Sequence, residues 1–333
     1  MAVSLLGALS AAVAYIVLAW PLPAQRGCPS TATLLEKPDT GCFERWYAPQ
    51  GKRRISGVAL VVHGLNVRPE MMESLISVLN AAGIEALNIS LYGHGDNYQP
   101  GRSGSVSEKR QRLDSFKRVT FAAWLEEVRQ AYAKVLLRAR KKDAPLFFIG
   151  YSLGGLLGCS LVTEHTGIHF DKMVLFAPAI TLQPAIAYQL KPLERFPDFV
   201  IDSDAPPDQR ANDGTPVAAY MALLSGSRTF LERCGPKLNI PIIVFVDPLD
   251  EFISFSGLRE LVGSMGLDRW EIESVSKDNE TAPPAAYHMI ISEHGVGPAS
   301  WRRITETLRA FLRAPSSLPR KRKAQPNAQA PFY

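Results

Sequence analysis

Short apolar runs alternate with longer amphipathic segments along most of the chain. The short runs are rich in Val, Ile, Leu and Phe, which is typical of buried strands. We predict strands over residues 43–47, 58–62, 84–91, 145–149, 173–176, 240–246 and 270–275. Apolar positions at helical spacing predict helices over residues 69–83, 121–137, 153–165, 256–266 and 299–311. This alternation indicates an α/β fold, with a mostly parallel sheet and helices on both faces.

One interval between predicted strands is much longer than the others. Residues 182–238 contain many aromatic and aliphatic side chains, among them Phe196, Phe199 and Tyr220. We expect a helical lid insert over about 182–238 within a main domain that spans residues 26–314. Its apolar side chains either line an acyl slot or pack the lid onto the body.

The first 25 residues are strongly apolar. No charged residue lies between Ala2 and Trp20, a run long enough to cross a bilayer as a helix. Because no Lys or Arg precedes Arg26, an uncleaved anchor is favoured over a cleaved signal peptide. Pro21 disfavours a third alternative, a helix buried in the globular fold. We predict membrane association through residues 1–25, as a single-pass anchor, or export if the segment is a signal peptide.

Two features indicate opposite sides of the membrane for the main domain. Basic residues follow the apolar segment and, by the positive-inside rule, favour a cytoplasmic domain. A disulfide between Cys28 and Cys42 would instead require an oxidising compartment. The sequence leaves both alternatives open.

The formal net charge of +5 comes mostly from one cluster near the C-terminus. Residues 320–323 contribute four of these charges, within a Pro-, Ala- and Gln-rich tail over 315–333 that we expect to be disordered. The rest of the chain is near neutral, so we expect no nucleic-acid partner. The four cysteines show no CxxC spacing and the histidines no ligand spacing, so we expect no metal.

A GxSxG motif occupies residues 150–154, directly after the strand predicted at 145–149 and before an apolar helix. A serine in such a turn projects its hydroxyl beyond the carboxyl end of the sheet, where ligands bind in this architecture. Gly150 and Gly154 are needed because side chains there would collide as the strand turns back into the helix. We therefore predict Ser152 as a nucleophile; the alternative is an inert serine in a glycine-rich connection.

A serine nucleophile needs a histidine base that is oriented by a carboxylate. On such a sheet the chain order is Ser, then Asp or Glu, then His, which leaves His288 and His294. We favour His288, because it follows the last strand and precedes an apolar run. For the carboxylate we favour Asp250, at the tip of the turn after the preceding strand, over Asp247 and Glu251.

Acyl transfer also needs two N–H donors for the negative oxygen that develops. The backbone N–H of Leu153, next to the nucleophile, is one candidate. The second is the N–H of Leu65, in the loop after the strand at 58–62. His63, in the same loop, is expected to be a structural hydrogen-bonding residue.

The motifs VVHGLN, LYGHGDN and IGYSLGG, followed by a late Asp and His, together resemble the α/β-hydrolase superfamily. The resemblance covers about residues 43–312 and is strongest to the serine aminopeptidase-like branch, which contains monoacylglycerol lipases and lysophospholipases. The set of motifs in order is specific for the superfamily and much less so for a substrate. It implies no cofactor. It implies a nucleophile, its two partners and two oxyanion donors at Ser152, Asp250, His288, Leu65 and Leu153.

We therefore expect a serine hydrolase that cleaves carboxylic esters, with lipid-type or other apolar acyl esters as substrates. A serine aminopeptidase or amidase is the alternative, for which Asp202, Asp204 and Asp208 are the visible carboxylates that could hold a substrate amino group. A membrane-tethered binding protein on an inactive hydrolase scaffold is a second alternative. The complete set of triad residue types, in the right order, weighs against it.

Overall fold

The computed structural model describes residues 44–49, 55–99, 106–278 and 286–315. The predicted N-terminal segment, the cysteines at 28 and 42 and nearly all of the predicted basic tail lie outside these ranges. None of the helices within them is both long enough and apolar enough to cross a membrane.

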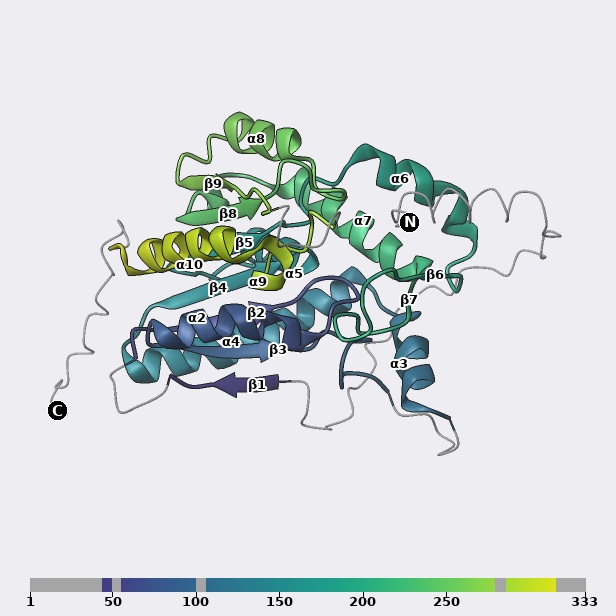
Figure 1. Ribbon diagram of the computed structural model, residues 1–333, viewed down its shortest axis with the longest axis horizontal. Coiled ribbons are helices and arrows are strands. Elements are labelled where there is room, and N and C mark those ends of the chain that lie inside the picture. The colour runs from purple at the N-terminus through teal and green to yellow at the C-terminus, as the bar shows by residue number, and fades with distance from the viewer. Residues whose placement is uncertain (1–43, 50–54, 100–105, 279–285, 316–333) are drawn as a thin grey trace, which may run out of the picture.

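A seven-stranded sheet forms the centre of the molecule (Figure 1). Its strands, in spatial order, are β1 (Glu44–Tyr47), β3 (Ile84–Ile89), β2 (Gly57–Val62), β4 (Leu146–Tyr151), β5 (Lys172–Phe176), β8 (Ile242–Val246) and β9 (Trp270–Ser274). All neighbouring strands are parallel except the edge pair of β1 and β3. The predicted α/β fold with a mostly parallel sheet is confirmed.

Helices cover both faces of the sheet (Figure 1). On one face lie α2 (Glu73–Ala81), which follows the short 3₁₀ helix η1 (Pro69–Met72), and α10 (Pro298–Arg313). On the other lie α4 (Phe121–Lys142) and α5 (Leu153–Glu164). With both faces covered, β2, β3, β4, β5 and β8 are buried along their whole length, which explains why most of their residues are apolar.

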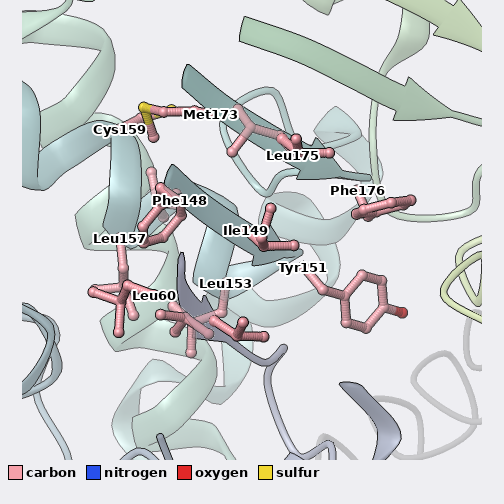
Figure 2. Close-up of a cluster of buried hydrophobic side chains, with 14 of the residues drawn as sticks. Leu60, Phe148, Ile149, Tyr151, Leu153, Leu157, Cys159, Met173, Leu175 and Phe176 are labelled. Carbon is pink, nitrogen blue, oxygen red and sulfur yellow. The ribbon is translucent and has the colours of Figure 1, made fainter. Parts of the chain in front are cut away.

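Helix α5 packs closely against β4. Figure 2 shows Phe148 of β4 beside Leu157 and Cys159 of α5 in this core. A Cβ atom at Gly158 would lie 2.1 Å from Cε1 of Phe148. The helix can therefore approach the sheet this closely only because residue 158 has no side chain.

Two of the differences between the predicted and the observed helices have a clear physical reason. Helix α4 continues to Lys142, five residues past the predicted end at 137, because Arg140, Lys141 and Lys142 stabilise the negative end of the helix dipole and Asp143 ends it in a left-handed conformation. Helix α3 (Glu108–Phe116) was not predicted. Among its nine residues only the last two are buried, so it has no apolar periodicity to detect.

The insert, residues 182–238, lies beyond the carboxyl ends of the strands, on the right in Figure 1. It contains α6 (Pro184–Leu190), η2 (Lys191–Arg195), the antiparallel strands β6 (Val200–Asp202) and β7 (Gly214–Pro216), α7 (Val217–Arg233) and η3 (Pro236–Leu238). The small sheet was not predicted. The insert has an apolar cluster of its own, formed by Ile186, Leu190, Leu193, Ile201 and Val217. After it, α8 (Phe255–Ser264) and the single turn α9 (Glu293–Val296) complete the fold.

Candidate active site

Ser152 sits in a strained turn between β4 and α5. Its backbone φ of 51° and ψ of −114° lie in a region that a residue with a side chain rarely adopts. The surrounding chain holds it there: its N–H donates to the carbonyl of Phe176 at 2.9 Å, and its carbonyl accepts the N–H of Ala179 at 3.0 Å. The turn directs the hydroxyl away from the helix and toward the carboxyl edge of the sheet.

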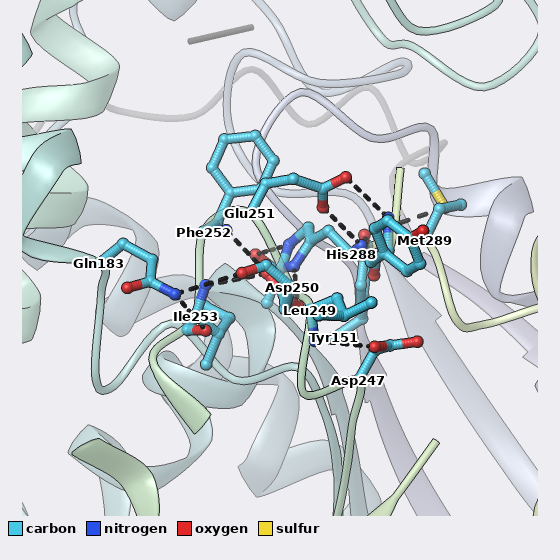
Figure 3. A network of polar contacts seen from close by, with 12 residues as sticks. Tyr151, Gln183, Asp247, Leu249, Asp250, Glu251, Phe252, Ile253, His288 and Met289 are labelled. Carbon is cyan, nitrogen blue, oxygen red and sulfur yellow. Dashed lines mark hydrogen bonds and ion pairs between the residues drawn. The ribbon is translucent and has the colours of Figure 1, made fainter. Parts of the chain in front are cut away.

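The structure brings Ser152, His288 and Asp250 together. His288 Nε2 lies 2.9 Å from Ser152 Oγ. On the other side of the ring, His288 Nδ1 lies 2.8 Å from Asp250 Oδ2 (Figure 3). Ser152 and His288 are 136 positions apart in the sequence. The side chain of Asp250 is fully buried, whereas that of His288 keeps 14% of its surface exposed. The arrangement can pass a proton from the hydroxyl to the imidazole while the carboxylate holds the ring.

The other two acidic residues of the turn after β8 make different bonds. Asp247 Oδ1 accepts the N–H of Leu249 at 2.9 Å, which stabilises the turn itself. Burial raises the pKa of Asp247, and the nearby charge of Asp250 raises it further. Asp250, and not Asp247, contacts the imidazole, so the orientation of the ring depends on Asp250. The second oxygen of Asp250, Oδ1, accepts the N–H groups of Phe252 and Ile253 at 2.8 and 2.9 Å.

Glu251 holds the backbone of the histidine. One carboxylate oxygen accepts the N–H of Tyr287 at 2.8 Å. The other accepts the N–H of His288 at 3.0 Å (Figure 3). In the sequence Glu251 is only an alternative to Asp250 for orienting the imidazole, and its contact with the backbone is not predicted. No local signal indicates this contact, because the bonded residues are 36 and 37 positions apart.

Two aromatic rings enclose the imidazole of His288. The ring centroid of Phe252 lies 5.0 Å away, edge to face, and that of Tyr151 lies 5.2 Å away. The Tyr151 hydroxyl donates to the carbonyl of His288 at 3.2 Å. These contacts restrict the rotation of the ring, so that Nε2 stays directed at Ser152.

The loop after β2, which contains Leu65, packs against the serine turn. A Cβ atom at Gly154 would lie 2.2 Å from the carbonyl oxygen of Val62, and one at Gly64 would lie 3.2 Å from Cβ of Ser152. Among the described residues, no group accepts a hydrogen bond from the backbone N–H of Leu65 or Leu153. Both N–H groups are thus available to a negative oxygen beside Ser152.

The remaining histidines near this edge do not contact the serine. His63 is fully buried; its Nδ1–H donates to the carbonyl of Gly64 at 2.7 Å, and its Nε2 accepts the N–H of Leu91 at 3.0 Å. Burial lowers the pKa of His63 to about 4, so it is neutral near pH 7. His294 lies exposed in α9, away from these contacts. In the part of the chain that the structure describes, no three His, Cys, Asp or Glu side chains are arranged to hold a metal ion.

The sequence of this chain matches a known protein family. Residues 53–220, slightly more than half of the chain, match the family of serine aminopeptidases S33, and the chain belongs to that family. The matched range contains Ser152, Leu65 and Leu153, whose roles remain predictions, and it ends before Asp250 and His288. The chain is therefore a hydrolase of the α/β type, as the sequence motifs predicted. Comparison with curated proteins found no match.

Solved structures share the fold. A soluble variant of monoglyceride lipase from Saccharomyces cerevisiae, in complex with a substrate analogue, aligns over 88% of this chain and 98% of its own, with a TM-score of 0.61 and 15% identity. A monoacylglycerol lipase from Paleococcus ferrophilus aligns over 81% of this chain and 97% of its own, with a TM-score of 0.59 and 16% identity. A structure from work on the metagenome-derived lipolytic enzymes LipS and LipT aligns over 82% of this chain and 98% of its own, with a TM-score of 0.61 and 17% identity.

Proposed function

We propose that this protein is a carboxylic ester hydrolase that forms an acyl-enzyme on Ser152. One observation carries the proposal: the two hydrogen bonds, of 2.9 and 2.8 Å, that join Ser152 to His288 and His288 to Asp250. A buried carboxylate that accepts the Nδ1–H leaves Nε2 unprotonated and facing the hydroxyl, which is the tautomer that a general base needs.

In the first half of the reaction, Ser152 Oγ attacks the ester carbonyl carbon while His288 Nε2 takes the hydroxyl proton. The carbonyl oxygen becomes an oxyanion that accepts the N–H groups of Leu65 and Leu153. Collapse of this intermediate breaks the ester C–O bond, and His288 gives its proton to the departing alcohol oxygen. Asp250 stays ionised throughout and stabilises the imidazolium.

In the second half, water replaces the alcohol. His288 takes a proton from the water, whose oxygen attacks the acyl carbon of the acyl-Ser152 ester. The new oxyanion accepts the same two backbone N–H groups. Its collapse breaks the bond to Ser152 Oγ, which regains the proton from His288, and a carboxylic acid leaves.

We propose esters with an apolar acyl or lipid part as the substrate class. The insert supports this, because its apolar cluster extends to Phe252, which lies against His288. The monoglyceride lipases among the structural neighbours are consistent with it. The predicted membrane anchor at residues 1–25, which lies outside the described residues, would keep the site near such substrates.

An aminopeptidase is the second candidate, because the family is named for one. Such an enzyme needs a carboxylate free to bind the substrate amino group. Asp250 and Glu251, the carboxylates that contact His288, already accept backbone or imidazole N–H groups. Asp202, Asp204 and Asp208 are exposed on the insert. These observations favour ester hydrolysis.

A fluorophosphonate probe tests the nucleophile. We expect it to label the wild-type protein and to lose all labelling in Ser152→Ala, because only an activated serine attacks phosphorus. Ser160→Ala is the matched control: Ser160 is buried in α5, the helix that follows Ser152, and its hydroxyl has no hydrogen-bond partner among the described residues, so labelling should persist. A folded wild-type protein that takes up no probe would contradict the proposal and favour the non-catalytic binding protein.

A series of p-nitrophenyl esters tests the substrate class. Each CH₂ group that is buried on binding contributes about 0.8 kcal/mol, so kcat/KM should rise several-fold per added CH₂ until the site is filled. Activity confined to acetyl esters, or faster release from aminoacyl p-nitroanilides, would rule out a lipid-type substrate.

A further inference from the structure

Asn66, the residue after Leu65, forms hydrogen bonds through its backbone N–H, its backbone carbonyl and its side-chain amide. It is 7% exposed and adopts a φ of 54°. Its backbone N–H donates to Nε2 of His94 at 2.9 Å, and its carbonyl accepts the N–H of Ala211 at 2.9 Å. The end of the loop that contains Leu65 is therefore fixed to two segments that are distant in the sequence.

The side-chain amide of Asn66 adds a reciprocal pair of bonds to the insert. Nδ2 donates to the carbonyl of Asn212 at 3.1 Å, and Oδ1 accepts the N–H of Asn212 at 2.8 Å. The amide thereby pairs with the backbone of residue 212 as a neighbouring strand would. Asn212 in turn donates its own Nδ2 to the carbonyl of Gly93 at 2.9 Å, next to His94.

We propose that Asn66 is a positioning residue that fixes the direction of the Leu65 N–H, with residue 212 of the insert as its anchor; this inference rests on the proposed function. The Leu65 loop is held between two surfaces. Gly64 packs against Tyr151 and Ser152 on one side, and Asn66 bonds to the insert on the other.

The bonds of a nearby residue, Arg68, extend this attachment. The backbone N–H of Arg68 donates to the carbonyl of Gln209 at 2.9 Å, and its Nε donates to the carbonyl of Arg210 at 3.1 Å. The insert thus contributes to the oxyanion site through the backbone of residues 209–212. An N–H donor that turns away from the developing charge loses most of its effect on the transition state. The attachment of the Leu65 loop to residues 209–212 should therefore affect the rate of ester hydrolysis.

Asn66 has a left-handed backbone conformation and two side-chain bonds to Asn212, and substitutions can change the bonds without changing the conformation. Its φ of 54° is tolerated by Asn, Asp and Gly. Asn66→Gly keeps the backbone conformation and removes both side-chain bonds. Asn66→Asp keeps the acceptor for the Asn212 N–H but places a carboxylate oxygen against the Asn212 carbonyl. Asn80→Ala is the matched control. The Asn80 amide also donates to two backbone carbonyls, those of Tyr47 and Ile84. Ile84 begins β3, so these bonds lie at the end of the strand away from the active site.

The experiment compares a p-nitrophenyl ester with its thionoester, in which sulfur replaces the carbonyl oxygen. Sulfur is a weak hydrogen-bond acceptor, so the ratio of the two kcat/KM values reports on the oxyanion donors. We expect Asn66→Gly to lower kcat for the ester about tenfold or more with KM changed less than about threefold, and to lower the ester-to-thionoester ratio by a similar factor. Asn80→Ala should leave the ratio unchanged.

Each outcome decides the inference. A lowered ratio in folded Asn66→Gly supports it, and a rate that falls equally for both substrates overturns it. If Asn66→Gly does not fold, the ratio in Asn66→Asp decides in the same way. Absence of probe labelling in the wild-type protein would overturn the proposed function and this inference together, whereas normal wild-type labelling with an unchanged ratio in the variants would overturn this inference alone.

Discussion

At the scale of single residues, the three acidic side chains of the turn after β8 have different hydrogen-bond partners. Asp247 bonds within the turn, Asp250 contacts the imidazole of His288, and Glu251 binds the backbone N–H of His288. Residue type does not distinguish them, since all three are buried or half-buried carboxylates. They differ in the direction in which each side chain leaves the turn, and this direction determines which group each carboxylate contacts.

Asp250→Asn and Asp247→Asn test this division. In Asp250→Asn the neutral amide cannot stabilise the imidazolium of His288 and favours the wrong tautomer, so kcat should fall by about 10³- to 10⁴-fold. In Asp247→Asn the amide oxygen can still accept the Leu249 N–H, so activity should stay within a few-fold of wild type. Steady-state kinetics on one ester measures both. A larger loss in Asp247→Asn than in Asp250→Asn would reverse the assignment.

At the scale of elements, the unit of β4, its turn and α5 places the nucleophile. Helix α5 is buried along almost its entire length, and its glycines let it approach β4 and the end of β2. Close packing of this unit supplies the force that keeps Ser152 in its strained conformation, because the turn cannot relax without moving the helix from the sheet.

Two helical glycines test this packing. A Cβ at Gly158 would overlap the fully buried ring of Phe148, so Gly158→Ala should lower the free energy of unfolding by about 1–3 kcal/mol. At Gly263, in α8, a Cβ would have no atom within 4 Å, so Gly263→Ala should raise that free energy by about 0.5–1 kcal/mol through helix propensity alone. Urea titration measures both, and equal effects would argue against steric control at Gly158.

At the scale of the whole molecule, two histidines join the loops at the carboxyl edge. His63 and His94 are fully buried with ring centroids 4.8 Å apart, and they bond to the backbone of Leu91 and Asn66 respectively. Burial lowers the pKa of His63 to about 4 and that of His94 well below its usual value, and the proximity of His63 lowers the latter further. The folded protein therefore favours the neutral form of both histidines.

Stability should consequently fall as the pH falls. An unfolded histidine binds a proton near pH 6.5, whereas folded His63 does so only near pH 4, so its contribution is present above pH 6.5 and is lost as pH falls toward 4. Between pH 6.5 and 5, His63 alone should lower the free energy of unfolding by about 1.5 kcal/mol. Urea titrations at these pH values measure this loss. His63→Gln should reduce it and exposed His169→Gln should not; an unchanged loss in His63→Gln would reject the explanation.

Much of the architecture was predictable because its signals are local. Continuous apolar runs indicate strands buried on both faces, and the glycines at 150 and 154 indicate the turn around Ser152. Helix α3 escaped prediction because little of it is buried, and the end of α4 was misplaced because charges rather than apolar residues extend it. The small sheet of the insert consists of two three-residue strands, too short to show a period.

Local patterns in the sequence were enough to predict the strands of the central sheet, most of the helices that cover it and the position of the serine turn, because side-chain periodicity and glycine sterics act over a few residues. It also limited the partners of Ser152 to a few Asp, Glu and His residues. The folded structure was needed to show that Asp250 contacts His288, that Glu251 binds the backbone of His288, and that Asn66 pairs with residue 212 across 146 positions. Such bonds depend on how folded loops meet in space, which no local pattern encodes.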